Sequence, residues 1–292
     1  MKKILSILIP VMILFSSYAS AEDPLPELKA KSLILMEADT GQILYEKNPD
    51  ERLPIASVTK VMTMLLTMEA IDSGKISEND TVTASERAKS MGGSTMFLEA
   101  GEQISVHDIL QGIAVASAND GAVAIAEHLA GSETAFVEEM NKRAAELKME
   151  NTHFVNTNGL DDDNHYSSAR DVAIMSRELL RHPKIFEYTT IWMDTLRDGK
   201  FQLANTNKLI RFYRGANGLK TGSTSKALCC LSATAERDGM QLVAVVLGAP
   251  TSKDRFAAAS GLLDYGFANY RTEKAVTAGE SLESVPVEKG VK

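Results

Sequence analysis

Ser57 and Lys60 stand three positions apart at the head of an almost wholly apolar segment, LPIASVTKVMTMLLTMEA, residues 53–70. Read as a helix that begins near Ser57, the segment has apolar side chains in every direction, which is typical of a helix inside a protein. The two polar side chains would then lie one turn apart on one face. An unpaired buried ammonium costs several kcal/mol or loses its proton. The pair is therefore easier to explain by chemistry than by architecture.

An S-x-x-K spacing is common by chance, and Ser223 and Lys226 repeat it in this chain, so Ser57 and Lys60 alone are weak evidence. Two further motifs follow: SAN at residues 117–119, which begins 60 residues after Ser57, and KTG, which begins 103 residues after that. Each motif is uninformative by itself. Their order and spacing together resemble the motif set of class A β-lactamases and penicillin-binding proteins.

The elements that must position these motifs follow from the apolar patterns. Residues 32–48 contain two strand-like runs around a DTG turn, which predicts a hairpin. Apolar spacings of three and four predict mostly helices from residue 76 to about 205. Two strands follow at 226–236 and 240–249, and a helix over 253–269 would pack on the sheet. We therefore expect an α+β fold, with an antiparallel sheet formed from both ends of the chain, flanking helices and an inserted helical subdomain.

The N-terminus has the three-part pattern of a secretory signal peptide. Lys2 and Lys3 precede a 12-residue apolar run, residues 4–15, which is too short to span a bilayer comfortably, and small residues follow up to Ala21. Cleavage after Ala21 would leave 271 residues and, because the two lysines are lost, change the formal charge from −8 to −10. We expect an exported protein of the periplasm, the extracytoplasmic envelope or the medium. Its acidic surface argues against nucleic acid as a partner.

The cysteines and histidines suggest no further chemistry. Cys229 and Cys230 are adjacent in an apolar run, so a strand would point them to opposite faces as packed thiols. His165, in LDDDNHYSS, is interpreted as part of a solvated loop and not as a metal ligand. We expect neither a metal site nor a cofactor.

Longer stretches around the motifs resemble D-alanyl-D-alanine carboxypeptidases of the low-molecular-mass penicillin-binding group. The resemblance covers roughly residues 30–270 and is carried by ASVTKVMTMLL, GGSTMFLEAGE, VASANDGAVAIAEHLAG, NTHFVNTNGLD, GLKTGSTSKA and LGAPTSKDRF. It implies a β-lactamase/DD-peptidase-like fold. It also implies removal of the last D-alanine from peptidoglycan stem peptides through an acyl-enzyme, with inhibition by β-lactams such as penicillin.

The resemblance also implies roles for individual residues. Ser57 would be the nucleophile, Lys60 its base, and Ser117 a proton relay to the leaving amine. The substrate-binding residues would be Asn119, Lys220, Thr221, Gly222, Ser223 and Arg255. Within this set, the backbone N–H groups of Ser57 and Ser223 would form the oxyanion hole, and Thr221 and Arg255 would receive the terminal carboxylate. Arg255 could instead be a surface ion-pair partner of Asp254 or Glu236.

Many members of the family continue into a β-rich domain and a membrane-associated helix. Here we expect a signal peptide over 1–21, a catalytic domain over 22–271 and a tail over 272–292 that holds at most the first strand of such a domain. This leaves membrane attachment in doubt. Two alternatives remain: a class A-like β-lactamase, although no E-x-x-L-N stretch lies between Ser117 and Lys220, or a non-catalytic penicillin- or peptidoglycan-binding protein. Turnover of a D-alanyl-D-alanine peptide and of a penicillin would separate them.

Overall fold

The computed structural model describes residue 25 and residues 27–273. The expected signal peptide and nearly all of the expected tail lie outside the described residues. Among the helices of the described part, none is long and apolar enough to cross a membrane.

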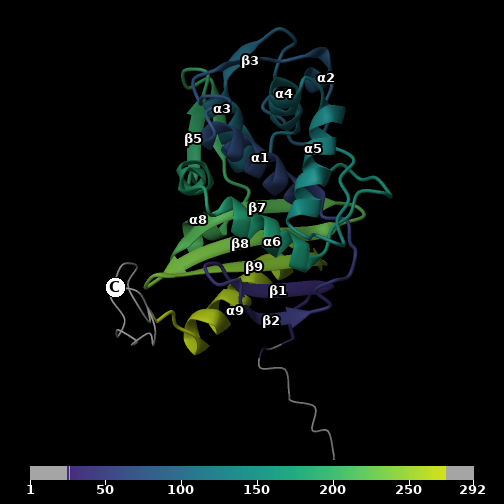
Figure 1. Ribbon diagram of the computed structural model, residues 1–292. Coiled ribbons are helices and arrows are strands. Elements are labelled where there is room, and N and C mark those ends of the chain that lie inside the picture. Colours follow the sequence, from purple (N-terminus) through teal and green to yellow (C-terminus); the bar gives the residue numbers. More distant parts are fainter. Residues whose placement is uncertain (1–24, 26, 274–292) are drawn as a thin grey trace, which may run out of the picture.

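A five-stranded sheet with strand order β2-β1-β9-β8-β7 forms the lower half of the molecule (Figure 1). Its neighbouring strands are all antiparallel, and β1 pairs with β9, so the sheet joins the two ends of the described chain as expected. Its strands are β1 Ser32–Glu37, β2 Ile43–Lys47, β7 Ala216–Thr224, β8 Leu228–Arg237 and β9 Met240–Ala249. The predicted β8–β9 hairpin is confirmed, with Asp238 and Gly239 at positive φ in its turn.

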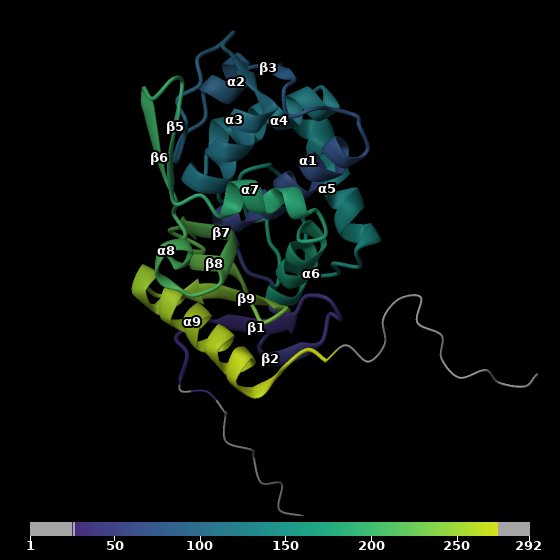
Figure 2. The same ribbon diagram turned by 90° about the vertical axis from the view of Figure 1, so that its left-hand side faces the viewer.

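Both faces of this sheet are covered, which explains why its strands are apolar without alternation. In β9, Leu242 and Ala244 pack in the core beneath α9 (Ser252–Asn269), whereas Val243 and Val245 pack in the core beneath the other helices. Figure 2 shows α9 along one side of the sheet, whereas on the other side lie α1 (Lys60–Asp72), α4 (Asn119–Ala130), α5 (Glu133–Glu146) and α6 (Ala169–Leu179). The closing helix therefore packs as the sequence predicts.

The segment between the two sheet regions is less uniformly helical than predicted. It contains two small antiparallel hairpins, β3 Thr81–Thr83 with β4 Gln103–Ser105, and β5 Met193–Leu196 with β6 Phe201–Ala204. Each hairpin strand has at most four residues, so the periodicity of the neighbouring helices hides it. The helical elements of this segment are α2 Glu86–Lys89, α3 Val106–Gln111, η2 Gly112–Ala116, α4 Asn119–Ala130, α5 Glu133–Glu146, α6 Ala169–Leu179, η3 Pro183–Ile185, α7 Phe186–Thr189 and α8 Leu209–Phe212.

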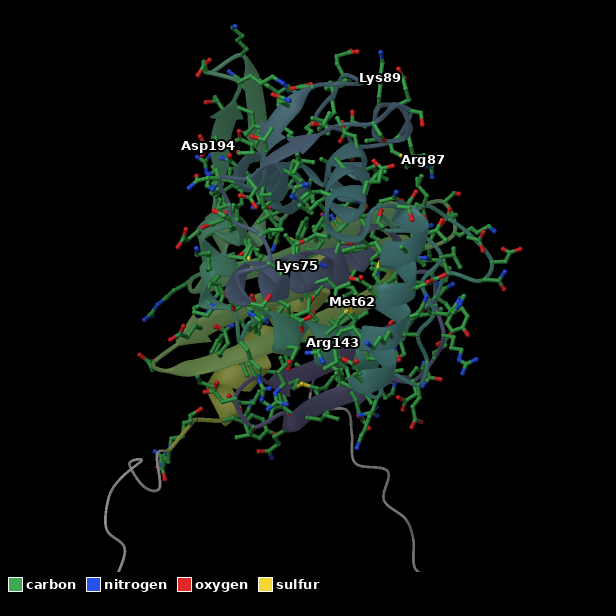
Figure 3. The ribbon with its side chains drawn as sticks, turned by 45° about the horizontal axis from the view of Figure 1, so that its top comes forward. Met62, Lys75, Arg87, Lys89, Arg143 and Asp194 are labelled. Carbon is green, nitrogen blue, oxygen red and sulfur yellow. The ribbon has the colours of Figure 1, made fainter. Side chains whose placement is uncertain are left out.

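Helix α1 (Lys60–Asp72) lies at the centre, packed against α4, α5 and α6. Arg143 of α5, labelled in Figure 3, forms ion pairs with Glu69 of α1 at 2.7 Å and Glu178 of α6 at 2.8 Å. The expected helix start is wrong by three residues: residues 56–59 form the 3-10 turn η1, and α1 begins at Lys60. Ser57 therefore lies in a tight turn, and Ala56, the first residue of that turn, has φ +48°.

Candidate active site

Lys60 is fully buried at the first position of α1, and its ammonium group meets three oxygen acceptors. Nζ lies 2.9 Å from Ser57 Oγ, 2.6 Å from Asn119 Oδ1 and 2.8 Å from the carbonyl oxygen of Asn158. Burial, and then the nearby positive charge of Lys220, hold the pKa of Lys60 well below its usual value of 10.5. The arrangement places a lysine with a lowered pKa beside a serine hydroxyl.

Ser117 reaches the same place from a sharp bend between two helices. The preceding residues form the π-helix η2, and Ser117 itself has φ +65°, an uncommon conformation for a residue with a side chain. Helix α4 then begins at Asn119, whose Nδ2 donates to the carbonyl of Gly92 at 2.7 Å. The amide thereby contacts both Lys60 and the loop around Gly92.

Asp120 holds the loop that follows Gly92 through hydrogen bonds to its backbone. Its carboxylate, 1% exposed, accepts hydrogen bonds from the backbone N–H groups of Met96 at 3.0 Å and Leu98 at 3.0 Å. The loop in turn brings Ser94 to the wall of the cleft. Sequence reasoning missed Ser94, although it lies in the GGST stretch that carried the resemblance.

Strand β7 forms the opposite wall and passes very close to the turn that holds Ser57. A Cβ placed on Gly222 would lie 2.7 Å from the carbonyl oxygen of Ile55 and 3.0 Å from the nitrogen of Ser57, so a side chain here would push the strand away. Lys220, a residue of this strand, is fully buried, and burial and the charge of Arg255 lower its pKa to about 7. Its Nζ donates to the carbonyl of Thr221 at 2.9 Å.

Arg255, in the first turn of α9, is 7% exposed and lies among neutral partners. It donates to the carbonyl of Gly222 at 3.1 Å and to Ser252 Oγ at 3.1 Å. Within the described part of the chain it forms no ion pair, and Asp254 instead caps its own helix through Thr251. The alternative of a surface ion pair is wrong, because the guanidinium points inward beneath β7. A buried cation without a carboxylate is suited to an anionic ligand.

These elements enclose a cleft of about 210 Å³ lined by Ser57, Ser94, Ser117, Thr206, Thr221, Gly222, Ser223 and Arg255. Six of the nine predicted site residues line it, while the other three (Lys60, Asn119 and Lys220) lie behind its wall. Thr206 was missed, and its Oγ accepts a hydrogen bond from Thr221 Oγ at 2.7 Å. A larger hollow of about 440 Å³ near Arg177 and Glu236 contains none of the motif residues, so chemistry and not size selects the smaller cleft.

The fold and the cleft define a class of protein: a serine enzyme of the β-lactamase/DD-peptidase-like fold. Comparison with known proteins narrows this class. The family model for D-alanyl-D-alanine carboxypeptidases matches residues 18–251, and the chain belongs to that family. It is thus a D-alanyl-D-alanine carboxypeptidase of the low-molecular-mass penicillin-binding group.

Two relatives illustrate the extent of the similarity. D-alanyl-D-alanine carboxypeptidase DacF of Bacillus subtilis is 49% identical over 300 residues, which cover 99% of this chain and 77% of that protein. DacA of Haemophilus influenzae is 40% identical over 273 residues, which cover 91% of this chain and 69% of that protein.

Solved structures agree with these relatives. Penicillin-binding protein 5 of Haemophilus influenzae superposes with a TM-score of 0.84 at 39% identity, covering 88% of this chain and 76% of that one. Penicillin-binding protein D2 of Listeria monocytogenes, in its ampicillin-bound form, has a TM-score of 0.75 at 33% identity, covering 83% of this chain and all of that one.

Proposed function

We propose that the chain removes the terminal D-alanine from peptidoglycan stem peptides, with Ser57 as nucleophile and Lys60 as its base. The observation that carries this proposal is the 2.9 Å contact between Ser57 Oγ and the fully buried Nζ of Lys60, whose pKa is lowered by burial and by Lys220. A lysine with a lowered pKa is neutral often enough to accept the serine proton.

The reaction then divides into two steps. Ser57 Oγ attacks the carbonyl carbon of the penultimate D-alanine while Lys60 Nζ takes the hydroxyl proton. As the C–N bond breaks, Ser117 would give its hydroxyl proton to the departing D-alanine amine and take the proton that Lys60 holds, so that Lys60 is neutral again and an ester to Ser57 remains. Water hydrolyses this ester, releasing the shortened peptide and regenerating the serine. The N–H groups of Ser57 and Ser223 would hold the oxyanion, a contribution of about 3 kcal/mol per donor.

The remaining cleft residues would select the substrate. Asn119, whose Oδ1 accepts from Lys60, would also hold the substrate amide, while Thr221, Lys220 and Arg255 would receive the terminal carboxylate. The inward-facing guanidinium of Arg255, 3.1 Å from the carbonyl of Gly222, supports this assignment because it carries a charge that no described carboxylate neutralises.

Penicillin labelling tests the nucleophile. Penicillin-treated wild-type protein should gain the mass of one penicillin, because a β-lactam mimics the D-alanyl-D-alanine amide, and Ser57→Ala should gain nothing. An adduct on Ser57→Ala would show that the nucleophile is wrongly assigned. Ser223→Ala is a matched control: it removes a hydroxyl from the same cleft but keeps the backbone N–H, so it should still be acylated.

The acyl-enzyme should persist, which separates a carboxypeptidase from a β-lactamase. No Asp or Glu is among the residues that line the described cleft, so no carboxylate is in place there to activate a deacylating water. Rapid turnover of penicillin would favour the β-lactamase alternative. Absence of turnover for both penicillin and a D-alanyl-D-alanine peptide would favour a binding protein.

We also infer export, with residues 1–21 as the leader and 22–271 as the catalytic domain. The support is the Lys2–Lys3 start, the short apolar run and the substrate class, since peptidoglycan lies outside the cytoplasmic membrane. Mass spectrometry of the protein from its host should find a mature N-terminus at Glu22.

A further inference from the structure

His165 is buried, contrary to the expected solvated loop. Its side chain is 3% exposed, and Nε2 lies 2.7 Å from Oγ of Thr59, the last residue of the turn η1 that carries Ser57. On its other side, His165 Nδ1 accepts a hydrogen bond from the backbone N–H of Val155 at 3.1 Å. The ring therefore links the loop of residues 155–166 to the nucleophile turn.

The hydrogen bonds around this ring allow one tautomer. The hydroxyl of Thr59 donates its single proton to the carbonyl of Ala56 at 2.8 Å, so it must accept from His165 Nε2. Because Nδ1 accepts from Val155, the proton of the neutral imidazole lies on Nε2. The result is a directed chain from the ring through the Thr59 hydroxyl to the Ala56 carbonyl.

That carbonyl belongs to the same peptide unit as the N–H of Ser57. A peptide unit is planar and trans, so fixing the direction of its C=O also fixes the direction of its N–H. Ala56 has φ +48°, a conformation that a residue with a side chain keeps only when its surroundings impose it. The hydrogen bond from Thr59 is one such constraint.

The loop of residues 155–166 also contacts the Ala56–Ser57 peptide directly through its backbone. Gly159 has φ +88°, and a Cβ placed on it would lie 1.9 Å from the Ala56 oxygen, so the loop backbone touches this carbonyl directly. One residue earlier, the carbonyl of Asn158 accepts from Lys60 Nζ at 2.8 Å. One loop thus contacts both the base and the peptide that precedes the nucleophile.

We propose that His165 is a positioning residue for acyl transfer: acting through Thr59, it orients the Ala56–Ser57 peptide so that the Ser57 N–H points at the developing oxyanion. The inference deepens the proposed function, since it requires Ser57 to be the nucleophile and its N–H to be an oxyanion donor. His165 itself does not touch the substrate.

Two matched pairs of variants test the chain of contacts. Thr59→Val keeps the shape and removes the hydroxyl, whereas Thr59→Ser keeps the hydroxyl. His165→Asn places an amide near Nδ1 and keeps an acceptor for Val155 but cannot reach Thr59, whereas His165→Gln places an amide N–H near Nε2 and keeps the donor to Thr59. The readouts are the second-order rate constant for acylation by penicillin, and kcat and KM for a D-alanyl-D-alanine peptide.

We expect Thr59→Val and His165→Asn each to lower the acylation rate constant by about tenfold to a hundredfold, below the hundredfold or more that follows complete loss of an oxyanion donor. The loss should appear in kcat with little change in KM, because the oxyanion forms only in the transition state. Thr59→Ser and His165→Gln should stay within about threefold of wild type. The double variant Thr59→Val/His165→Asn should be no slower than the slower single variant, because both break one chain.

A role confined to holding the loop gives a different pattern. His165→Gln would then be at least as slow as His165→Asn, because it is the contact with Val155 that ties the loop together. That order, or wild-type acylation by Thr59→Val, would overturn the proposal. If His165→Asn does not fold, as judged by circular dichroism, the Thr59 pair decides. Nitrogen NMR of the wild-type imidazole determines the tautomer independently. A proton on Nδ1 would contradict the hydrogen-bond chain from His165 through Thr59 to the Ala56 carbonyl.

Ser57→Ala separates this inference from the function on which it depends. Acylation of Ser57→Ala would contradict the proposed function itself. No acylation of Ser57→Ala, together with wild-type rates in Thr59→Val and His165→Asn, would contradict only the positioning role.

Discussion

Lys60 has three oxygen acceptors within 2.9 Å and no carboxylate among them, a surrounding that stabilises its charge only partly. The positive charge of Lys220 lowers the pKa of Lys60, while the negative charge of Asp120 raises it by a smaller amount. The same balance applies to Lys220, whose pKa falls to about 7 because of burial and Arg255. At the residue scale, three buried cationic side chains lie in or beside the cleft, and burial, together with the mutual repulsion of neighbouring charges for the two lysines, lowers the pKa of each.

Lys60→Arg should be folded and nearly inactive, because guanidinium keeps the positive charge but hardly deprotonates. Lys60→Met, uncharged and of similar length, should also be inactive. In the wild type, the acylation rate should rise with pH as Lys60 loses its proton, since only the neutral amine is a base. Stopped-flow acylation across pH measures this rise. Near wild-type turnover by Lys60→Arg would eliminate the role of general base.

Arg255→Ala should lower kcat/KM for a peptide that ends in a free carboxylate by about tenfold to more than a hundredfold, since a charge-assisted hydrogen bond contributes roughly 1.5–3 kcal/mol. The same peptide capped as a C-terminal amide should be slow with wild type and barely affected by the substitution. Structural damage would lower both rates equally, so the amide is the internal control. If the effects of the substitution and of the amide cap on kcat/KM are additive in this cycle of two enzymes and two substrates, Arg255 does not bind the substrate carboxylate.

At the scale of elements, the active site is formed by close contacts between backbone segments as well as by side chains. Strand β7 and the loop of residues 155–166 approach the turn η1 from two sides, and each does so at a glycine, Gly222 and Gly159. The close contacts let backbone groups serve as donors and acceptors without intervening side chains.

Gly159→Ala should therefore nearly abolish acylation and destabilise the protein. Its Cβ would lie 1.9 Å from the Ala56 oxygen, so the loop or the nucleophile turn must move. Gly74→Ala is a matched control, because Gly74 also has positive φ, +72°, but has nothing within 4 Å of the added Cβ. The control should lose about 1 kcal/mol of stability from backbone strain alone and keep its activity. Thermal melts and penicillin acylation measure both, and equal activities in the two variants would contradict the close-contact argument.

At the scale of the whole molecule, the chain has a formal charge of −8, whereas the one charged residue among the described residues that line the cleft is the cation Arg255. In the proposed function, a substrate ending in a carboxylate would approach against the average field and would depend on Arg255 and Lys220 for local attraction. The buried, ionisable groups also make the stability of the fold depend on pH, because each has a proton affinity that differs between the folded and unfolded states.

His165 provides a clear case. Burial lowers the pKa of His165 from 6.5 to about 4, with Asp161 and Asp162 opposing the shift and His153 adding to it. Its neutral form stabilises the fold above pH 6.5, and this contribution is lost as pH falls from 6.5 to about 4, because the unfolded chain binds the proton first. The free energy of unfolding should fall between pH 7 and pH 4 by about 3 kcal/mol more in wild type than in His165→Asn. Urea unfolding at the two pH values measures the difference, and parallel curves would show that His165 is not buried in its neutral form.

The sequence by itself determined the class of the protein and most of its frame. Motif order and spacing singled out Ser57, Lys60 and the KTG motif as candidates, and local apolar patterns predicted the β1–β2 and β8–β9 hairpins and the closing helix α9. These features can be predicted from the sequence because each depends on neighbours within a few residues, or on a chemistry that few residue types can perform.

Tertiary structure alone decided what surrounds Ser57. The 3-10 turn in place of a helix start, the burial of His165 and the partners of Arg255 all depend on segments far apart in the chain; Thr59 and His165, for example, are 106 residues apart. The run LDDDNHYSS is polar enough to predict a solvated loop, yet its histidine is buried because Nδ1 finds a partner in Val155 of the same loop and Nε2 finds one in the distant Thr59. A polar residue is buried only where its hydrogen bonds are satisfied, and a local sequence pattern does not contain the distant partners that satisfy them.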